Sequence, residues 1–315
     1  MKRLLLLFIL ILSITFICAC EKNDYEDEGK ISVVTVNFPP YDFTSVIGGD
    51  KVSVTLLVKP GTESHTYEPK PKEMRKIAEC DLFIYGGGES DEWVETLLSG
   101  EEYRNINTLK MMKLCSLRDE ETKEGMTIKK KEDNGDEDEH EYDEHVWTSV
   151  LNAKLIVEGI CEKLSAVSPE NSTFFEENAK AYLNELDKID SEIREVVKAG
   201  NKDTLIFGDR FPFLYFVKEY SLDYFAAIPG CAAETEPSAQ TVAFLIDKVK
   251  KEKINVILYL ELTNAKIAKV ISEETGAKIM MFHSCHNLSQ DEFERGENYL
   301  SLMKKNIEVL KEALE

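Results

Sequence analysis

Short runs of β-branched and aromatic residues alternate with longer helical stretches along both halves of this 315-residue chain. The runs that read as buried strands lie at 31–36, 52–58, 81–85, 204–207, 222–228, 255–260 and 277–282. Strands that alternate with helices in this way favour parallel sheets covered by helices. We therefore predict an α/β fold in which each half of the chain builds its own parallel sheet.

A single long helix is predicted between the two halves. Ser168 and Pro169 suit the cap and the first turn of a helix. From Phe175 to Val196 the apolar residues are spaced alternately by four and three positions, which keeps them on one face of a helix. Gly200 ends the pattern. The fold class we predict is therefore two small parallel-sheet βα lobes joined by one long rigid backbone helix.

The first twenty residues have the features of an export signal. Lys2 and Arg3 precede a short apolar core, which is too short and wrongly flanked for a membrane span. The segment that ends at Cys20, ICAC, resembles a bacterial lipobox. We expect Cys20 to be lipidated and the protein to be anchored to the outer face of the bacterial cell membrane. An ordinary signal peptide with another cleavage point is the alternative.

The domain organisation follows from these patterns. The predicted parts are a lipoprotein signal peptide (1–20), a tether (21–29), an N-terminal lobe (30–167), a linking helix (168–200) and a C-terminal lobe (201–315). The segment after the signal is long enough for two lobes that each have a core.

Composition and cysteine spacing limit the partners. The formal net charge of −21 argues against nucleic acid or an anionic membrane surface as a partner. The triple glycine at 86–88 lacks the GxGxxG spacing, and the sequence contains no P-loop, so nucleotide binding has no support. The cysteines after Cys20 are odd in number and lack a CxxC motif, which is no disulfide framework. Only Cys231 and Cys285 are candidates for a disulfide, because both fall in predicted loops of the second half.

An acidic segment runs from Glu132 to Trp147 and reads EDNGDEDEHEYDEHVW. Such a run cannot bury apolar surface, so the loop at 132–145 should be solvated. It is either a solvated charged loop or a segment that raises the local concentration of cations near His145. In the second case His140 would add one imidazole to its carboxylates. Its HEYDEH string is no HExxH protease motif, because histidines five residues apart do not stack on one helix face.

Four residues of metal-binding type lie at loops beside the predicted elements. His65 follows the second strand, His145 precedes a helix, and Asp209 and His283 each follow a strand of the second half. In parallel sheets, ligands gather beyond the carboxyl ends of the strands. A single histidine is more often a surface or hydrogen-bonded residue than a metal ligand. Four residues of metal-binding type that all lie at loops make a metal site a better explanation. We predict that these four side chains bind a metal ion in a cleft between the lobes.

These residues lie in segments that resemble the metal-binding lipoproteins of ABC importers for zinc and manganese. The resemblance covers nearly the whole chain after the signal and is carried by VVTVNFPPYDFTSVIGGDKVSVTLLVKPGTESHTYEPKPKEM, HVWTSVLNAKLIVEGI, GCAAETEPSAQTV and GAKIMMFHSCHN. It implies an extracytoplasmic solute-binding protein, not an enzyme, that captures Zn²⁺ and delivers it to an ABC permease. We expect a monomer that contacts the membrane through its lipid anchor.

Two positions depart from the pattern of that family. Asp209 stands where a histidine or glutamate is common, and His283 stands where an aspartate is common. Three imidazoles and one carboxylate suit tetrahedral Zn²⁺ better than Mn²⁺, which prefers more oxygen ligands. His286 or Cys285 is an alternative to His283 as a ligand, and Arg210 offers Asp209 a salt bridge instead of a metal.

Other functions remain open at this point. The same fold could bind Mn²⁺ or Fe²⁺, or serve as a surface adhesin. An exported zinc-dependent hydrolase with Glu234 or Glu236 as its base is less well supported, because four protein ligands would close the metal site to the water that a hydrolase needs.

Overall fold

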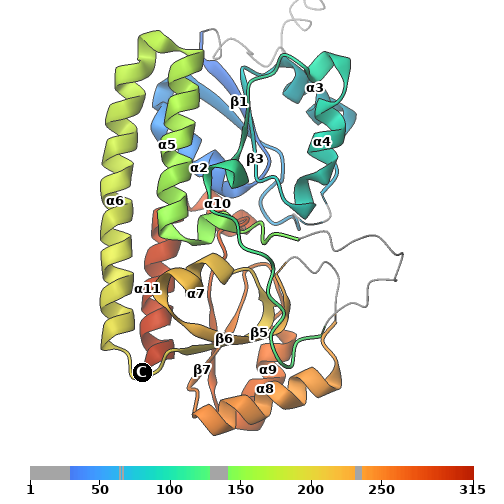
Figure 1. Cartoon of the computed structure of the whole chain (residues 1–315), viewed down its shortest axis with the longest axis vertical. Coiled ribbons are helices and arrows are strands. Elements are labelled where there is room, and N and C mark those ends of the chain that lie inside the picture. The colour runs from blue at the N-terminus through green and yellow to red at the C-terminus, as the bar shows by residue number, and fades with distance from the viewer. Residues whose placement is uncertain (1–28, 64, 66, 128–140, 231–235) are drawn as a thin grey trace, which may run out of the picture. The chain divides into compact units, whose positions relative to one another are not determined.

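The computed structural model describes residues 29–63, 65, 67–127, 141–230 and 236–315. Residues 31–315 form one compact unit that contains two parallel four-stranded sheets (Figure 1). We call the part around the first sheet the first lobe and the part around the second sheet the second lobe. The α/β fold predicted from the alternation of strands and helices is therefore confirmed.

The sheets have closely similar topologies. The first has the order β2-β1-β3-β4 and the second the order β6-β5-β7-β8, and every pairing is parallel. The strands are β1 (Ile31–Thr35), β2 (Val52–Leu56), β3 (Leu82–Tyr85), β4 (Thr108–Lys110), β5 (Thr204–Phe211), β6 (Asp223–Pro229), β7 (Val256–Tyr259) and β8 (Lys278–Met281). Strand β4 was not predicted from the sequence, because three residues are too few to show a periodic pattern.

Helices cover the sheets and connect them. They are α2 (Phe38–Gly48), α3 (Pro71–Glu79), α4 (Glu92–Leu98), α5 (Val150–Val167), α6 (Ser172–Ala199), α7 (Leu214–Tyr220), α8 (Ala239–Glu252), α9 (Lys266–Thr275), α10 (Gln290–Glu294) and α11 (Tyr299–Leu314). Figure 1 shows α6 running alongside both lobes, with α5 beside it in the first lobe and α11 beside it in the second.

Helix α6 buries the apolar stripe seen in the sequence. Its buried residues are Phe175, Ala179, Tyr182, Leu186, Ile189 and Ile193. They recur at spacings of three and four residues, as expected for one face of an α-helix. That face packs against α2, α5 and α11, so the long helix contacts elements on both sides of the site described below.

One apolar cluster extends through both lobes. It includes Val33 in β1, Trp147 before α5, Phe207 in β5 and Tyr299 in α11. A buried carboxylate lies where three helices of this core meet: Oδ2 of Asp42 in α2 accepts hydrogen bonds from Tyr182 Oη and from the Tyr299 backbone N, both at 3.1 Å. Burial raises the pKa of Asp42 to about 6, although the two hydrogen bonds oppose this shift.

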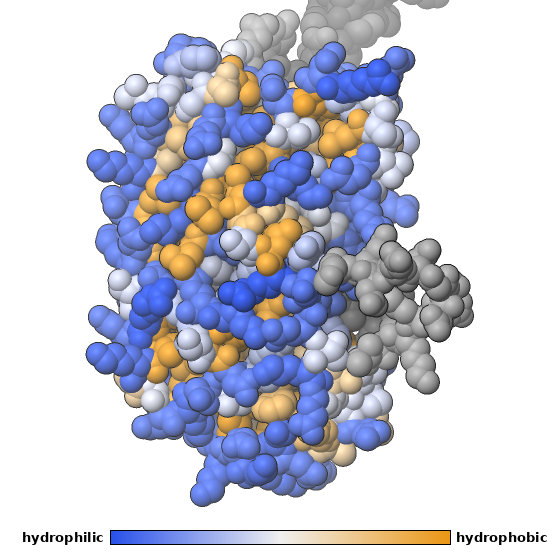
Figure 2. Space-filling view, in the orientation of Figure 1, coloured by the Kyte–Doolittle hydropathy of each residue, from blue (hydrophilic) through white to orange (hydrophobic). Residues whose placement is uncertain are grey.

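The face shown in Figure 2 is largely hydrophilic. Hydrophobic residues gather on its upper half, where α5 lies, and α5 carries two exposed leucines, Leu151 and Leu155. Among the described residues, none of the helices has the length and apolar character needed to cross a bilayer.

Several predictions concern segments outside the described residues. These are the signal peptide with Cys20, nearly all of the tether, most of the acidic loop with His140, and the loop that holds Cys231 and Glu234. The pairing of Cys231 with Cys285, the only candidate disulfide, is therefore untested, and Cys285 is buried.

Candidate metal centre

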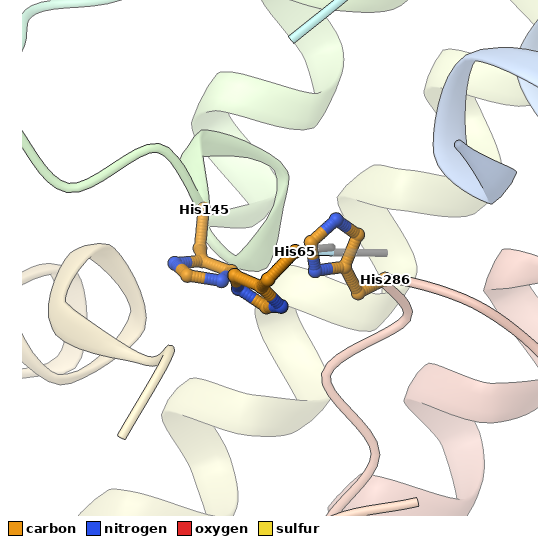
Figure 3. Close-up of side chains that lie close together, drawn as sticks. All are labelled: His65, His145 and His286. Carbon is orange, nitrogen blue, oxygen red and sulfur yellow. The ribbon is translucent and has the colours of Figure 1, made fainter. Parts of the chain in front are cut away.

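Three imidazole rings meet where loops of the two lobes come together (Figure 3). His65, His145 and His286 each offer one ring nitrogen, and these three nitrogens lie within 4.8 Å of one another. Their ring centroids are 4.9 to 5.6 Å apart. His65 and His145 belong to the first lobe, whereas His286 follows the last strand of the second. All three lie largely or fully out of solvent.

His65 is held by a carboxylate two residues before it. Glu63 Oε1 accepts a hydrogen bond from the His65 backbone N at 3.3 Å and lies 2.8 Å from His65 Nδ1. The other oxygen, Oε2, accepts a hydrogen bond from Nη2 of Arg210 in the second lobe at 3.0 Å. The bond to His65, and then the charge of Arg210, hold the pKa of Glu63 well below its usual range despite partial burial.

His145 is held in the same manner. It directly precedes a 3₁₀ turn at Val146–Thr148 that leads into α5. Asp143 Oδ1 accepts a hydrogen bond from the His145 backbone N at 2.8 Å and lies 3.1 Å from Nδ1. Burial opposes a charge on His145, but Asp143 and Glu144 outweigh it and raise the pKa of His145 above its ordinary value.

These contacts leave the other nitrogen of each ring available. When a carboxylate faces Nδ1, that nitrogen carries the proton and Nε2 presents its lone pair. The Nε2 atoms of His65 and His145 are buried and have no hydrogen-bond partner among the described residues. Buried polar atoms normally have partners, so two unpartnered nitrogens in one cluster fit the ligands of a metal ion.

His286 reaches the cluster because the chain reverses after β8. Cys285 adopts a left-handed conformation with φ of 59°, which is uncommon for a residue with a side chain. Beyond it, Asn287 Nδ2 donates to the carbonyl oxygens of Lys59 at 2.8 Å and Thr62 at 2.9 Å. These bonds attach the loop of the second lobe to the loop of the first.

The protonation state of His286 also suits ligation. Burial lowers the pKa of His286 well below its ordinary value, and the neighbouring rings of His65 and His145 lower it further. The imidazole is therefore neutral near neutral pH, and a neutral imidazole is the form that binds a metal ion.

The structure does not bring His283 to this cluster. Asn306 of α11 fixes its backbone, because Asn306 Oδ1 accepts from His283 N and Asn306 Nδ2 donates to His283 O, each at 2.8 Å. The His283 Nδ1 accepts a hydrogen bond from the Cys285 backbone N at 2.9 Å, and its Nε2 lies 3.8 Å from Glu292 Oε2. His283 thus contacts second-lobe residues, and the residue of this loop that joins the cluster is His286, which the sequence left as an alternative.

Asp209 is not part of the three-histidine cluster either. The sequence predicted that it follows a strand, but β5 continues to Phe211 and contains it. A register irregularity between Phe207 and Arg210 disturbs the pairing there. Asp209 Oδ2 accepts hydrogen bonds from Thr263 Oγ1 at 2.8 Å and from the Leu260 backbone N at 3.3 Å. Burial raises the pKa of Asp209, while these bonds and Arg210 oppose the rise.

Sequence reasoning missed the two carboxylates that orient the histidines. Glu63 and Asp143 stand two residues before His65 and His145, in the strings ESH and DEH. The repeated spacing is a signal that could have identified them. Glu236, suggested as a hydrolase base, is exposed and lies 3.5 Å from Lys266 Nζ.

The chain matches a family model described as zinc-uptake complex component A, periplasmic, over residues 33–313. It is 34% identical over 314 residues to the zinc-binding lipoprotein AdcA of Streptococcus pneumoniae (strain ATCC BAA-255 / R6), covering 99% of this chain and 61% of that protein. The chain therefore spans about three fifths of the length of this relative.

Two further comparisons cover nearly the full length of both partners. The high-affinity zinc uptake system protein ZnuA of Bacillus subtilis (strain 168) is 31% identical over 316 residues, covering 98% of this chain and 97% of that protein. The crystal structure of the Zn(II)-bound ZnuA-like domain of S. pneumoniae AdcA aligns with a TM-score of 0.74 at 32% identity, covering 91% of this chain and 99% of that one.

Proposed function

Because the chain belongs to the family of periplasmic component A of zinc-uptake complexes, we propose that it captures Zn²⁺ outside the cytoplasm and delivers it to an ABC permease. The metal would be bound by the imidazoles of His65, His145 and His286. The relatives that resemble the chain are named as zinc-binding and zinc-uptake proteins, and the family is one of uptake components rather than enzymes.

The observation that carries this proposal is the convergence of the three rings. Three ring nitrogens lie within 4.8 Å of one another, and two of the rings have their Nδ1 atoms turned toward carboxylates. A carboxylate behind a metal-binding histidine fixes its tautomer and orientation. Imidazole nitrogens suit Zn²⁺, whereas Mn²⁺ prefers a larger number of oxygen ligands. We therefore favour zinc over manganese as the cargo.

This ligand set revises the one expected from the sequence. His65 and His145 are retained, and His286 replaces His283. Asp209 is assigned to the second lobe's own hydrogen bonds, because its Oδ2 joins Thr263 to Leu260. The lipid anchor at Cys20 and the monomeric state also remain proposals.

The test is metal analysis of the purified protein that lacks residues 1–20. We expect about one Zn²⁺ per chain, since three histidines form one cluster and a structural or transport site binds a single ion. Competition with Mn²⁺ should leave zinc bound. Protein that takes up Mn²⁺ in preference to Zn²⁺, or that binds neither ion, would contradict the proposal.

A further inference from the structure

Glu144 places a carboxylate beside the three-histidine cluster. Its Oε1 lies 3.6 Å from the unpartnered Nε2 of His65, and its side chain is only 4% exposed. It directly precedes His145 in the sequence. The sequence placed Glu144 in the acidic loop at 132–145, which was expected to be solvated, but this end of the loop is buried.

The separation of the two atoms is close to that of two ligands on one ion. Zinc lies about 2.0–2.2 Å from nitrogen and carboxylate oxygen, so neighbouring ligand atoms in a tetrahedral site are roughly 3.3–3.4 Å apart. The observed 3.6 Å between Glu144 Oε1 and His65 Nε2 is near this value. It is too long for a direct hydrogen bond between the same atoms.

The local structure holds Glu144 in this position. The backbone N of Ser90 donates to Glu144 Oε2 at 2.9 Å, and the Ser90 hydroxyl donates to Oε1. Ligating carboxylates are commonly supported by such hydrogen bonds. The chain also leaves room for the side chain, because a Cβ added to Gly88 would lie 2.2 Å from the Glu144 Cβ. A side chain at position 88 would therefore collide with Glu144.

The other carboxylates near the site have different partners. Glu261, in the second lobe, also lines the cavity at the three rings. Both its oxygens accept hydrogen bonds from Ser284, as those of Glu144 do from Ser90, but its Oε2 lies 3.7 Å from Nδ1 of His283, which is outside the cluster. Glu63 contacts the other ring nitrogen of His65, Nδ1, and not the unpartnered Nε2. Asp209, as described above, is bonded to Thr263.

We propose that Glu144 is the fourth ligand of the metal ion, through Oε1. This inference rests on the proposed function, since it needs an ion bound by the three histidines. The first lobe then supplies three of the four ligands and the second lobe supplies His286. A carboxylate would also neutralise part of the charge of a divalent ion that three neutral imidazoles leave uncompensated in a buried site.

The test compares Glu144→Gln with Asp91→Asn as a matched control. Asp91 is a second buried carboxylate that faces the same small cavity as Glu144, and it is bonded to the backbone N atoms of Gly86 and Gly87. Zinc affinity would be measured by competition with a chelator, and coordination by X-ray absorption on the zinc-loaded proteins. We expect Glu144→Gln to bind zinc at least tenfold more weakly, with one fewer oxygen ligand from the protein around the ion. Asp91→Asn should change zinc affinity less than threefold.

A second variant keeps the carboxylate but displaces it. Gly88→Ala should push Glu144 away from the cluster, so it should weaken zinc binding while thermal unfolding of the metal-free protein still shows one folded state. Its coordination should match that of Glu144→Gln.

Two outcomes would overturn the inference. If Glu144→Gln binds zinc like the parent and Glu261→Gln does not, the fourth ligand comes from the second lobe and the proposed function stands. If the parent protein binds no zinc, the proposed function fails and the inference fails with it.

Discussion

A single carboxylate oxygen of Asp143 contacts both the backbone N of His145, at 2.8 Å, and its ring Nδ1, at 3.1 Å. Glu63 repeats the arrangement with His65, at 3.3 and 2.8 Å. In both cases the acidic residue stands two residues before the histidine. Its side chain can therefore contact both the backbone and the ring of that histidine. Two histidines from separate loops therefore present the same nitrogen to the cluster.

Replacing Asp143 with asparagine should weaken zinc binding about 10–100-fold, the usual effect of removing the partner of a metal-binding histidine. An amide can still accept the backbone hydrogen bond, but it supports the orientation and basicity of the ring less well. Isothermal titration with a competing chelator would measure the change. Asp187→Asn is a suitable control, because Asp187 is exposed and forms a surface ion pair with Lys154. Equal affinities for both variants would argue against the role of Asp143.

Zinc affinity should fall as the pH is lowered, because protons compete with the ion for the imidazoles. The pKa of His145 is raised and that of His286 is lowered, so His145 should be protonated before His286. The loss should therefore begin near or above the ordinary histidine pKa of about 6.5. In Asp143→Asn the pKa of His145 falls, and the decline should move to lower pH. A pH profile identical to that of the parent would contradict this assignment.

His283 and His286 can be distinguished by the same substitution at each position. His286→Asn should lower zinc affinity by at least 100-fold, because it removes one of three nitrogen ligands. His283→Asn should keep zinc affinity within a few-fold, since an asparagine oxygen can accept the hydrogen bond that His283 Nδ1 receives from Cys285. Equilibrium dialysis against buffered zinc would compare them. The reverse order of effects would restore His283 as the ligand.

Asp42 should make the stability of the metal-free protein depend on pH. Its pKa is about 6 in the folded state and near 3.8 when exposed, so the folded state binds the proton more tightly. The stabilising effect of that proton is complete below pH 4 and is lost as the pH rises to about 6, by at most about 3 kcal/mol. Asp42→Asn should therefore raise Tm relative to the parent more at pH 8 than at pH 4.5.

Calorimetry in the presence of a chelator would measure this difference. Asp50→Asn is the control, because the Asp50 side chain is 74% exposed and should show no comparable dependence. If the Tm difference between Asp42→Asn and the parent is the same at both pH values, protonation of the Asp42 carboxyl does not affect the stability of the fold.

Trp147 should report metal binding by its fluorescence. Its ring centroid lies 4.9 Å from that of His286 and 5.5 Å from that of His145, and its Nε1 donates to the Ser284 carbonyl. The only other tryptophan in the sequence, Trp93, contacts Tyr67 and Phe83 in a separate cluster. Zinc should change the emission of Trp93→Phe as in the parent, while Trp147→Phe should lose most of the change.

The fold was largely predictable because its signals are local and periodic. The stripe from Phe175 to Val196 predicted the long helix α6, and the β-branched runs predicted seven of the eight strands. The extra length of β5 was not predictable, because Asp209 and Arg210 are polar residues that the pattern assigns to a loop. Their inclusion depends on pairing with β6 around an irregular register, which is a tertiary contact.

The site was predictable only in part for a similar reason. The positions of His65 and His145 at the ends of local elements marked them. The choice between His283 and His286 depends on the left-handed turn at Cys285 and on contacts of Asn306 and Asn287 with distant segments. No local sequence pattern records such contacts.

The apolar cluster that extends through both lobes also sets how an ion can be exchanged. Separating the lobes would expose this core to water at a cost of about 25 cal/mol for each Å² of apolar surface. Small movements of the loops that bear His65 and His286 expose far less. We therefore expect ion exchange to proceed with a nearly constant radius of gyration, through movements of the loops at the site rather than through a change in the distance between the lobes.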